Sequence, residues 1–341
     1  MGADVGARLF AAGVTALVLC AGCGGAQQTE SSEEREARQA ALIRQQLRES
    51  WTPPVLLWQV AAGSTGLSEP SWIFASLPYG STLHDALPEP HDRVVARATR
   101  MVLEVDPGSL ELPALYETYH LGRRDRLDRM LGTTAWGQLR AEMGGLLPDT
   151  VLRQLQPWVL ALHVGRIRMA EAEATAEGRR IVPGAASTAS VSNDLLEQAR
   201  RRGIETAWLD PDPATYIADF EEIGTDHWVL ALREELEAID VVRARMTQLR
   251  EAYASRDETR IREACTAAST LDPEAASLQT ALVAARARRW LPVVEQHARR
   301  GSTLIAVDAC TLLQDDGLLA QLYGTGLRLQ RLGAPPGTER P

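Results

Sequence analysis

Lysine is absent from this chain of 341 residues, so all 36 of its basic side chains are arginines. This absence excludes Schiff-base catalysis and phosphate binding by a P-loop, because both depend on a lysine amine. Cysteine is scarce, and four residues are too few for a disulfide scaffold or an array of zinc modules. The formal net charge is -9. No nucleic-acid partner is expected, because the chain has no excess of positive charge to pair with phosphates.

Several sequence motifs of known enzymes are missing as well. The six histidines never occur at the His-x-x-x-His or His-Glu-x-x-His spacing, which excludes a helix-borne zinc site of the usual kind. No Gly-x-Ser-x-Gly segment is present, so the sequence has no nucleophile elbow. Hydrophobic residues make up 45% of the chain, which is ordinary for a globular protein and excludes disorder as the main state.

The first 50 residues are typical of an export signal followed by a tether. Arg8 precedes an apolar run over residues 9–22 that is too short to cross a bilayer comfortably. The segment Ala21-Gly22-Cys23 resembles the end of a bacterial lipobox, which predicts a signal peptide over 1–22, a lipid on Cys23 and a tether over 23–50. Gly24 rather than Asp follows the cysteine, which favours the outer membrane, facing the periplasm. The alternative is an ordinary secretory signal cut after Ala21.

Residues 51–333 are predicted to form one α/β domain, a mixed β-sheet with extensive flanking helices, followed by a flexible tail over 334–341. Apolar runs bounded by turn residues indicate strands, and three- and four-residue spacings of apolar side chains indicate helices. The segment 171–192, rich in small and polar residues, is predicted to be a loop, followed by a helix capped by Asn193 or Asp194. The expected strands are 55–60 and 71–77, which form a hairpin, and 101–106, 205–209, 303–307 and 327–332; the expected helical segments are 92–100, 110–168, 194–202, 212–300 and 317–323.

The order of several short segments resembles the TraB/GumN family, which includes PrgY-like proteins and the Tiki proteases. These segments are Leu-Trp-Gln-Val at 57–60, Val-Leu-Glu-Val-Asp at 102–106, Leu-Gln-Pro-Trp at 155–158, the arginine-rich segment 286–290 and the segment 304–318. The resemblance requires strands 101–106 and 303–308 to be neighbours. It also implies metal-dependent peptide hydrolysis by two Gly-x-x-His motifs and an acidic residue, since a metal held by such ligands activates water.

Both histidine positions of that family are changed here. Pro78 stands at the first, and proline has no side-chain donor atom, whereas Thr311 stands at the second, where a neutral hydroxyl replaces imidazole. Glu104 and Arg286 are retained. We therefore expect a pseudoenzyme that holds no metal or other cofactor and acts in the cell envelope by binding a peptide or protein.

A divergent metal-dependent hydrolase is the alternative, with Glu104, Asp308, Arg286 and possibly His84 in a rearranged site. Carboxylates at the carboxyl ends of strands suit acid–base chemistry or a divalent cation, because ligands bind at that edge of an open α/β sheet. The simpler interpretation is that these carboxylates cap helices or pair with arginines, and that His84 lies on the surface. The carboxylates at predicted strand ends are Glu104, Asp106, Asp210 and Asp308.

Cys265 and Cys310 remain after removal of the signal segment. They could pair in an oxidising compartment. We expect instead two separate buried thiols, because Cys310 lies in an apolar run typical of a strand, where cysteine behaves as a small hydrophobic residue.

Overall fold

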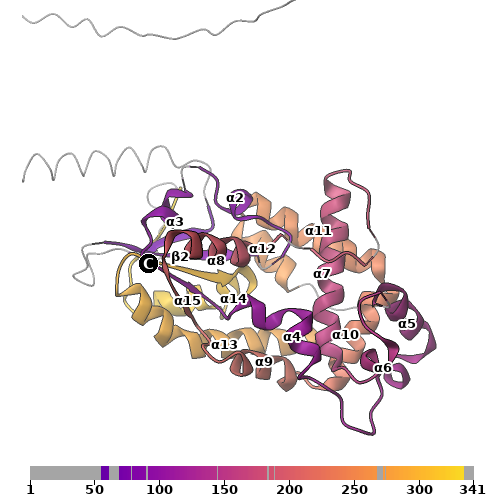
Figure 1. Ribbon diagram of the computed structural model, residues 1–341. Coiled ribbons are helices and arrows are strands. Elements are labelled where there is room, and N and C mark those ends of the chain that lie inside the picture. Colours follow the sequence, from indigo (N-terminus) through magenta and orange to yellow (C-terminus); the bar gives the residue numbers. More distant parts are fainter. Residues whose placement is uncertain are drawn as a thin grey trace, which may run out of the picture. The chain divides into compact units, whose positions relative to one another are not determined.

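Six strands form one mixed sheet in the computed structural model (Figure 1), in the order β4-β3-β5-β2-β1-β6. Strands β4, β3, β5 and β2 are parallel to one another, and β1 pairs antiparallel with both β2 and β6. The predicted mixed sheet, the β1–β2 hairpin and the neighbouring β3 and β5 are thereby confirmed. The strands are β1 (Leu57–Val60), β2 (Ser71–Ser76), β3 (Arg100–Leu103), β4 (Glu205–Trp208), β5 (Thr303–Asp308) and β6 (Leu329–Arg331).

The residues that the structure describes are 55–60, 69–77, 79–89, 91–143, 145–182, 184–187, 189–266, 272 and 274–333. All of them belong to one compact unit of the chain. The predictions for the signal segment and tether with Cys23, for Pro78 and for the tail 334–341 lie outside these residues.

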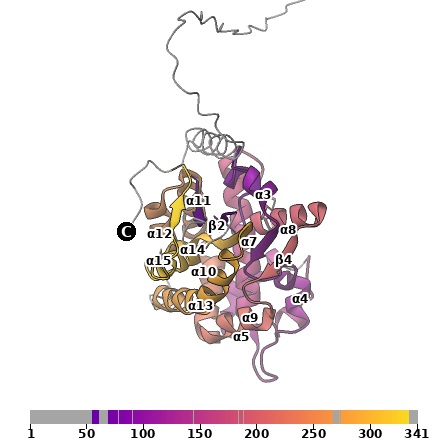
Figure 2. The ribbon, with the colours of Figure 1, turned by 90° about the vertical axis from the view of Figure 1, so that its left-hand side faces the viewer.

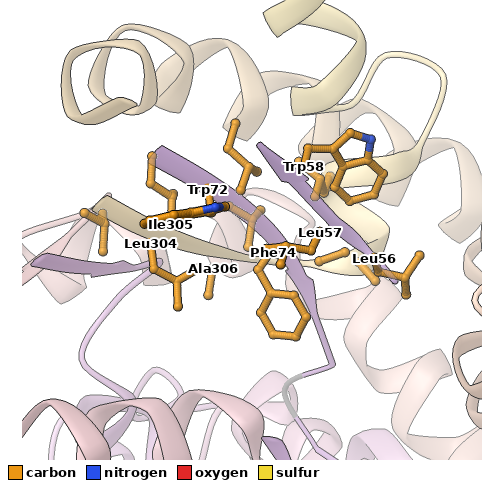
Figure 3. Close-up of a cluster of buried hydrophobic side chains, with 14 of the residues drawn as sticks. Leu56, Leu57, Trp58, Trp72, Phe74, Leu304, Ile305 and Ala306 are labelled. Atoms are coloured by element: carbon orange, nitrogen blue, oxygen red, sulfur yellow. The ribbon is translucent and has the colours of Figure 1, made fainter. Parts of the chain in front are cut away.

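The central strands are buried on both faces, which explains why their sequences are apolar throughout instead of alternating. Every residue of β2 is buried, as are the first five residues of β5. Figure 3 shows side chains from β1, β2 and β5 packed together, with Trp58 and Phe74 projecting from opposite faces. In Figure 1, helix α8 lies above the strands and α13 below them, so helices cover the sheet on both sides.

A second hydrophobic core lies among helices alone. Its buried residues come mainly from α4, α5, α7 and α10, and Figure 1 shows α5, α6, α7 and α10 gathered at one side of the sheet. Figure 2 shows α5 again far from α3, which leads into β3. None of the described helices is both long and apolar enough to span a bilayer. The helices are α2 (Leu83–Ala86), α3 (Arg93–Arg97), the 3-10 helix η2 (Pro107–Leu110), α4 (Leu112–Tyr116), α5 (Leu127–Met143), α6 (Asp149–Leu152), α7 (Pro157–Ala176), α8 (Val191–Arg202), α9 (Pro213–Glu222), α10 (Thr225–Glu237), α11 (Ile239–Ser255), α12 (Glu258–Cys265), α13 (Ala275–Ala298), α14 (Ala309–Leu313) and α15 (Leu318–Tyr323).

The predicted loop over 171–192 is wrong at both ends. Helix α7 continues to Ala176, because Ala172 and Ala174 are buried in its packing face and alanine is the best helix former. Helix α8 starts at Val191, so the predicted caps are wrong too: the Ser190 side chain accepts a hydrogen bond from the backbone N–H of Asn193.

The expectation of two separate thiols is also wrong, because Cys265 and Cys310 form a disulfide with a Cα–Cα distance of 5.5 Å. Cys310 lies in α14 and not in a strand. The Asp308 side chain accepts hydrogen bonds from the N–H groups of Cys310 and Thr311, which starts this short helix directly after β5. Helix α12, which ends at Cys265, packs against α14 and so brings the two sulfur atoms within bonding distance.

Candidate functional site

The carboxyl ends of the four parallel strands meet at one edge of the sheet and place polar side chains there. Ser76 at the end of β2 is in register with Asp308 at the end of β5. Glu104 directly follows β3, and Asp210 follows β4 with its N–H bonded to the Glu104 carbonyl at 2.8 Å. Glu104, Asp210 and Asp308 therefore lie at the same edge of the sheet.

Glu104 is held in place through both of its carboxylate oxygens. Oε1 accepts a hydrogen bond of 2.7 Å from the backbone N–H of Asp308, and Oε2 accepts one of 3.2 Å from the Tyr216 hydroxyl. Burial, with the nearby Asp308 carboxylate as a second cause, raises the pKa of Glu104 to about 7. Burial likewise raises the pKa of Asp308. This pair can therefore hold a proton at neutral pH, in a position where a bound molecule would reach it.

Arg286 of α13 supplies the positive charge beside the two carboxyls. Its Nε donates to Asp219 at 2.8 Å, and its guanidinium lies 4.2 Å from the centre of the Tyr216 ring. Arg289 bonds both Asp219 and Asp210, with four contacts between 2.8 and 3.1 Å. Two arginines thus neutralise two aspartates, while the Arg286 Nη atoms have no hydrogen-bond partner among the described residues.

A cavity of about 430 Å³ opens over this edge. We call it the first chamber; the sheet edge contributes Glu104 and Asp308, and the helical core contributes Leu115, Val159 and Leu162. The first chamber therefore lies between the two hydrophobic cores. His163 of α7 also lines it, and both ring nitrogens lack a partner within the described chain. Burial lowers the pKa of His163, so that its imidazole is neutral at pH 7 and can accept or donate one hydrogen bond.

A second cavity of about 440 Å³, the second chamber, adjoins the first. The two share the lining residues Leu162, Phe220, Met246, Arg286 and Asp308. The second chamber is lined further by Thr311 and by both cysteines of the disulfide. Together the chambers form what we call the cleft, a mostly apolar groove with a few charged groups at its middle, as is usual for ligand sites.

The other residues singled out in the sequence lie elsewhere. His84 is exposed on α2 and lines neither chamber, so it is not brought to Glu104 and Asp308. Asp106 caps η2 through a bond to the N–H of Gly108. Asp210 pairs with Arg289 at 2.8 Å, as the simpler interpretation of the strand-end carboxylates expects.

Three important residues of the site were missed in the sequence, namely Tyr216, Asp219 and Arg289. The first two lie on α9, one turn apart, and the third lies one turn after Arg286 on α13. The sequence did contain a signal. Tyr216 and Asp219 are three residues apart in one predicted helical segment, and Arg286 and Arg289 have the same spacing further along the chain. This signal identifies a polar helix face, but it does not identify the strand end against which that face packs.

The donor set of this edge does not suit a divalent metal. In the described ranges, no group of three or more His, Cys, Asp or Glu side chains is arranged to hold an ion. Both oxygens of Glu104 and the Oδ1 atom of Asp308 already accept hydrogen bonds from the protein, and Thr311 offers no imidazole. A catalytic metal of the zinc type needs three protein ligands, and two engaged carboxyls do not supply them.

The raised pKa of Glu104 predicts how stability changes with pH. The folded chain holds this proton up to about pH 7, whereas the unfolded carboxyl loses it near its ordinary pKa of 4.5. The free energy of unfolding therefore falls as pH rises between these values, by at most about 3 kcal/mol. We expect Glu104→Gln to remove this part of the decline, measured by denaturant unfolding from pH 4.5 to 8. An unchanged slope in the variant would contradict the assignment.

A protein-family model described as the TraB/PrgY/gumN family matches residues 56–331, which is most of the chain. Comparison with curated proteins and with solved structures found no match.

Proposed function

Since the chain belongs to the TraB/PrgY/GumN family, we propose that it is an exported, lipid-anchored protein of the cell envelope that binds a peptide or protein segment. In this proposal the family's metal-dependent hydrolysis is lost, and the fold serves as a binding module. The ligand lies in the cleft, over the carboxyl ends of the parallel strands.

The observation that carries the proposal is that the strand-end carboxyls accept hydrogen bonds from the protein itself. Glu104 and Asp308 bind protein N–H and O–H groups, and these same atoms would be needed to coordinate a metal. Thr311, at the family's second histidine position, is buried, and its N–H is bonded to Asp308. Pro78, at the first position, has no ligating atom in its side chain. The polar groups at this edge are therefore engaged in hydrogen bonds within the protein, and not arranged as metal ligands.

The size and shape of the cleft support a binding role. Two adjoining chambers of about 430 and 440 Å³ share Arg286 and Asp308 in their walls. In this proposal an extended ligand occupies both and places a polar group beside these two residues. Aromatic and aliphatic side chains supply most of the lining, which favours binding through apolar burial with a few orienting polar contacts.

The envelope location rests on the sequence around Cys23 and is supported by the Cys265–Cys310 disulfide. Disulfides persist in oxidising compartments such as the periplasm. An acyl chain pair on Cys23 would anchor the chain stably, because each buried methylene adds about 0.8 kcal/mol of membrane affinity. Incorporation of labelled palmitate that depends on Cys23 tests the anchor.

A metal titration tests the loss of metal-dependent hydrolysis. We expect no saturable change in the thermal midpoint of the full chain, purified in mild detergent, with Zn²⁺, Mn²⁺, Co²⁺ or Ca²⁺. A native-state ligand at 100 times its dissociation constant would add about 2.7 kcal/mol. A saturable shift that disappears in Glu104→Ala but remains in Asp106→Ala would contradict the proposal, since Asp106 caps η2 outside the cleft lining.

A hydrolase remains the alternative, because a specific observation favours it: the pKa of Glu104 is about 7, which suits a general acid or base at neutral pH. The test is cleavage of a mixed fluorogenic peptide set by the full chain. Cleavage that is lost in Glu104→Gln and kept in Asp106→Asn would establish the hydrolase and overturn the binding-only proposal.

A further inference from the structure

The second chamber has an excess of carboxylate that its own cations do not balance. Its two lining arginines are already engaged: Arg245 pairs with Glu234 at 3.0 Å, and Arg286 pairs with Asp219 at 2.8 Å. Two further carboxyls line the chamber, Glu235 and Asp308. Asp308 binds the N–H groups that start α14, which leaves Glu235 as the carboxyl without an assigned role.

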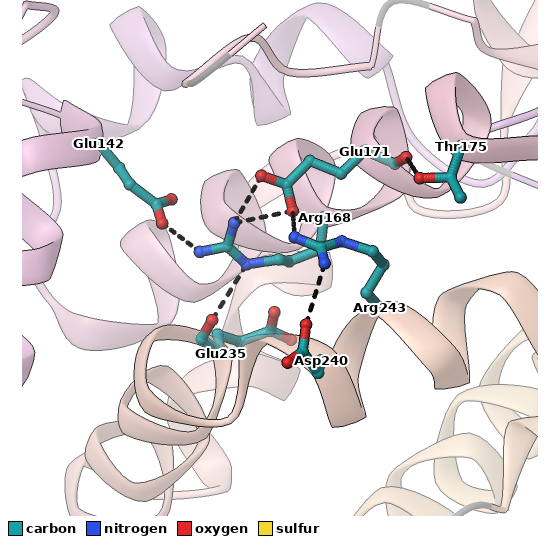
Figure 4. Close-up of polar contacts among 7 residues, drawn as sticks. All are labelled: Glu142, Arg168, Glu171, Thr175, Glu235, Asp240 and Arg243. Atoms are coloured by element: carbon teal, nitrogen blue, oxygen red, sulfur yellow. Dashed lines mark hydrogen bonds and ion pairs between the residues drawn. The ribbon is translucent and has the colours of Figure 1, made fainter. Parts of the chain in front are cut away.

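The Glu235 side chain is half-buried, and one of its two carboxylate oxygens is buried. Its Oε2 atom has no partner among the residues that the structure describes. Figure 4 shows the side chain beside Arg168, yet the Arg168 Nε donates to the backbone carbonyl of Glu235 at 3.1 Å, and its other nitrogens go to Glu142 and Glu171. A buried carboxylate oxygen without a donor is destabilising, so a donor from a ligand would be favoured here.

The charges that face Glu235 from its neighbouring helices do not supply a spare cation. Arg168 on α7 and Arg243 and Arg245 on α11 are positive, and all three bond other carboxylates. The carboxylates that these arginines bond are Glu171 on α7, Asp240 on α11, Glu142 on α5 and Glu234 on α10 itself. Burial raises the pKa of Glu235 to about 7; the charges of Arg168 and Arg245 lower it, and those of Glu234 and Glu142 raise it.

Aromatic rings complete the surroundings. Phe220 and Trp228 line the same chamber with their ring centres 6.0 Å apart in an edge-to-face arrangement. The Trp228 indole N–H is bonded to the Phe220 carbonyl at 2.6 Å, so the polar edge of the indole is satisfied. Aromatic faces attract cations through the negative charge of the ring face, which adds to the attraction of a carboxylate.

We propose that the second chamber binds a cationic group of the ligand, a primary ammonium or a guanidinium, with Glu235 as its carboxylate partner and Trp228 and Phe220 along its flank. The inference rests on the proposed function, because it names the chemical class of the bound segment: a peptide with a basic residue. Binding is coupled to ionisation, since the cation pairs with the charged form of Glu235 and displaces its proton.

Calorimetric titration with n-butylammonium tests this assignment on the full chain in mild detergent. We expect saturable binding that tightens about tenfold from pH 6 to pH 8, as a carboxyl with a pKa near 7 ionises, with proton release seen as a dependence on the buffer used. Glu235→Gln should weaken binding at pH 8 at least tenfold and abolish the proton release. Asp308 and His227 also line the chamber. They are present in both proteins, so a difference between the two is attributable to Glu235.

The matched control is Glu237→Gln, on the same helix and outside the lining of both chambers, which should leave binding unchanged. 1-Pentanol, a neutral probe of similar length, should bind equally to the original chain and to Glu235→Gln. Absence of saturable n-butylammonium binding, or equal binding by Glu235→Gln, overturns the inference. The metal titration and the cleavage assay do not involve Glu235, so the proposed function and this inference can fail separately.

Discussion

Replacing Arg168 with methionine is expected to lower the free energy of unfolding by about 3–5 kcal/mol, the cost of leaving buried carboxylates without their cation. The Arg168 side chain is 1% exposed and lies in the middle of the contacts drawn in Figure 4. Its Nη1 bonds both oxygens of Glu171 at 3.0 Å, and its Nη2 bonds Glu142. Guanidinium-denaturation curves of the two proteins at pH 7 measure the effect.

The size of this effect comes from the number of helices that the guanidinium joins. Glu142 is on α5, Arg168 and Glu171 are on α7, and the Glu235 carbonyl is on α10. Glu171 also accepts a bond of 3.2 Å from Arg243 of α11. Methionine fills much of the volume but leaves two carboxylates without their main cation, and these carboxylates help to hold the four helices together.

Two comparisons separate this cause from a general loss of packing. Arg168→Met/Glu171→Gln should recover part of the loss, because one uncompensated carboxylate is removed. Arg140→Met, which breaks the surface pair with Asp149, should cost less than about 1 kcal/mol. An equally large loss in Arg140→Met, or no recovery in Arg168→Met/Glu171→Gln, would contradict the explanation.

The sequence predicts the sheet well because its strands carry a local signal. β2, β3 and β5 are short apolar runs bounded by turn residues, and parallel strands buried on both faces are expected to have such sequences. The same rule misplaced Cys310, since the run after Asp308 is equally apolar. Asp308 at the end of β5 is the residue that caps α14. An aspartate at that position is a typical helix start, and it was the available signal for this helix.

The candidate site could be predicted only where it lies on strand ends. Glu104 and Asp308 follow parallel strands, so sheet geometry alone brings them to one edge. Tyr216, Asp219 and Arg289 reach the same place from α9 and α13, and their contribution depends on how these helices rotate and pack. Periodicity shows which side chains share a helix face, but it does not show what that face meets, which is also why His84 could be considered for the site.

Removing the Cys265–Cys310 disulfide is the second large expected effect. The bond closes a loop over a sequence separation of 45 residues, and the chain-entropy model gives about 4 kcal/mol of stabilisation for a loop of that length. The double variant Cys265→Ser/Cys310→Ser is therefore expected to unfold more easily than the original chain by about 2–4 kcal/mol, measured by denaturant unfolding without reductant.

Reductant provides the decisive control for this prediction. Dithiothreitol should bring the original chain down to the stability of the double variant and leave the variant itself unchanged. The disulfide also ties α12 to α14, and both of its cysteines line the second chamber beside Thr311. Loss of the bond should consequently weaken n-butylammonium binding as the chamber wall loosens. If the original chain keeps its full stability in reductant while the bond is shown to be broken, packing alone holds α12 and α14 together.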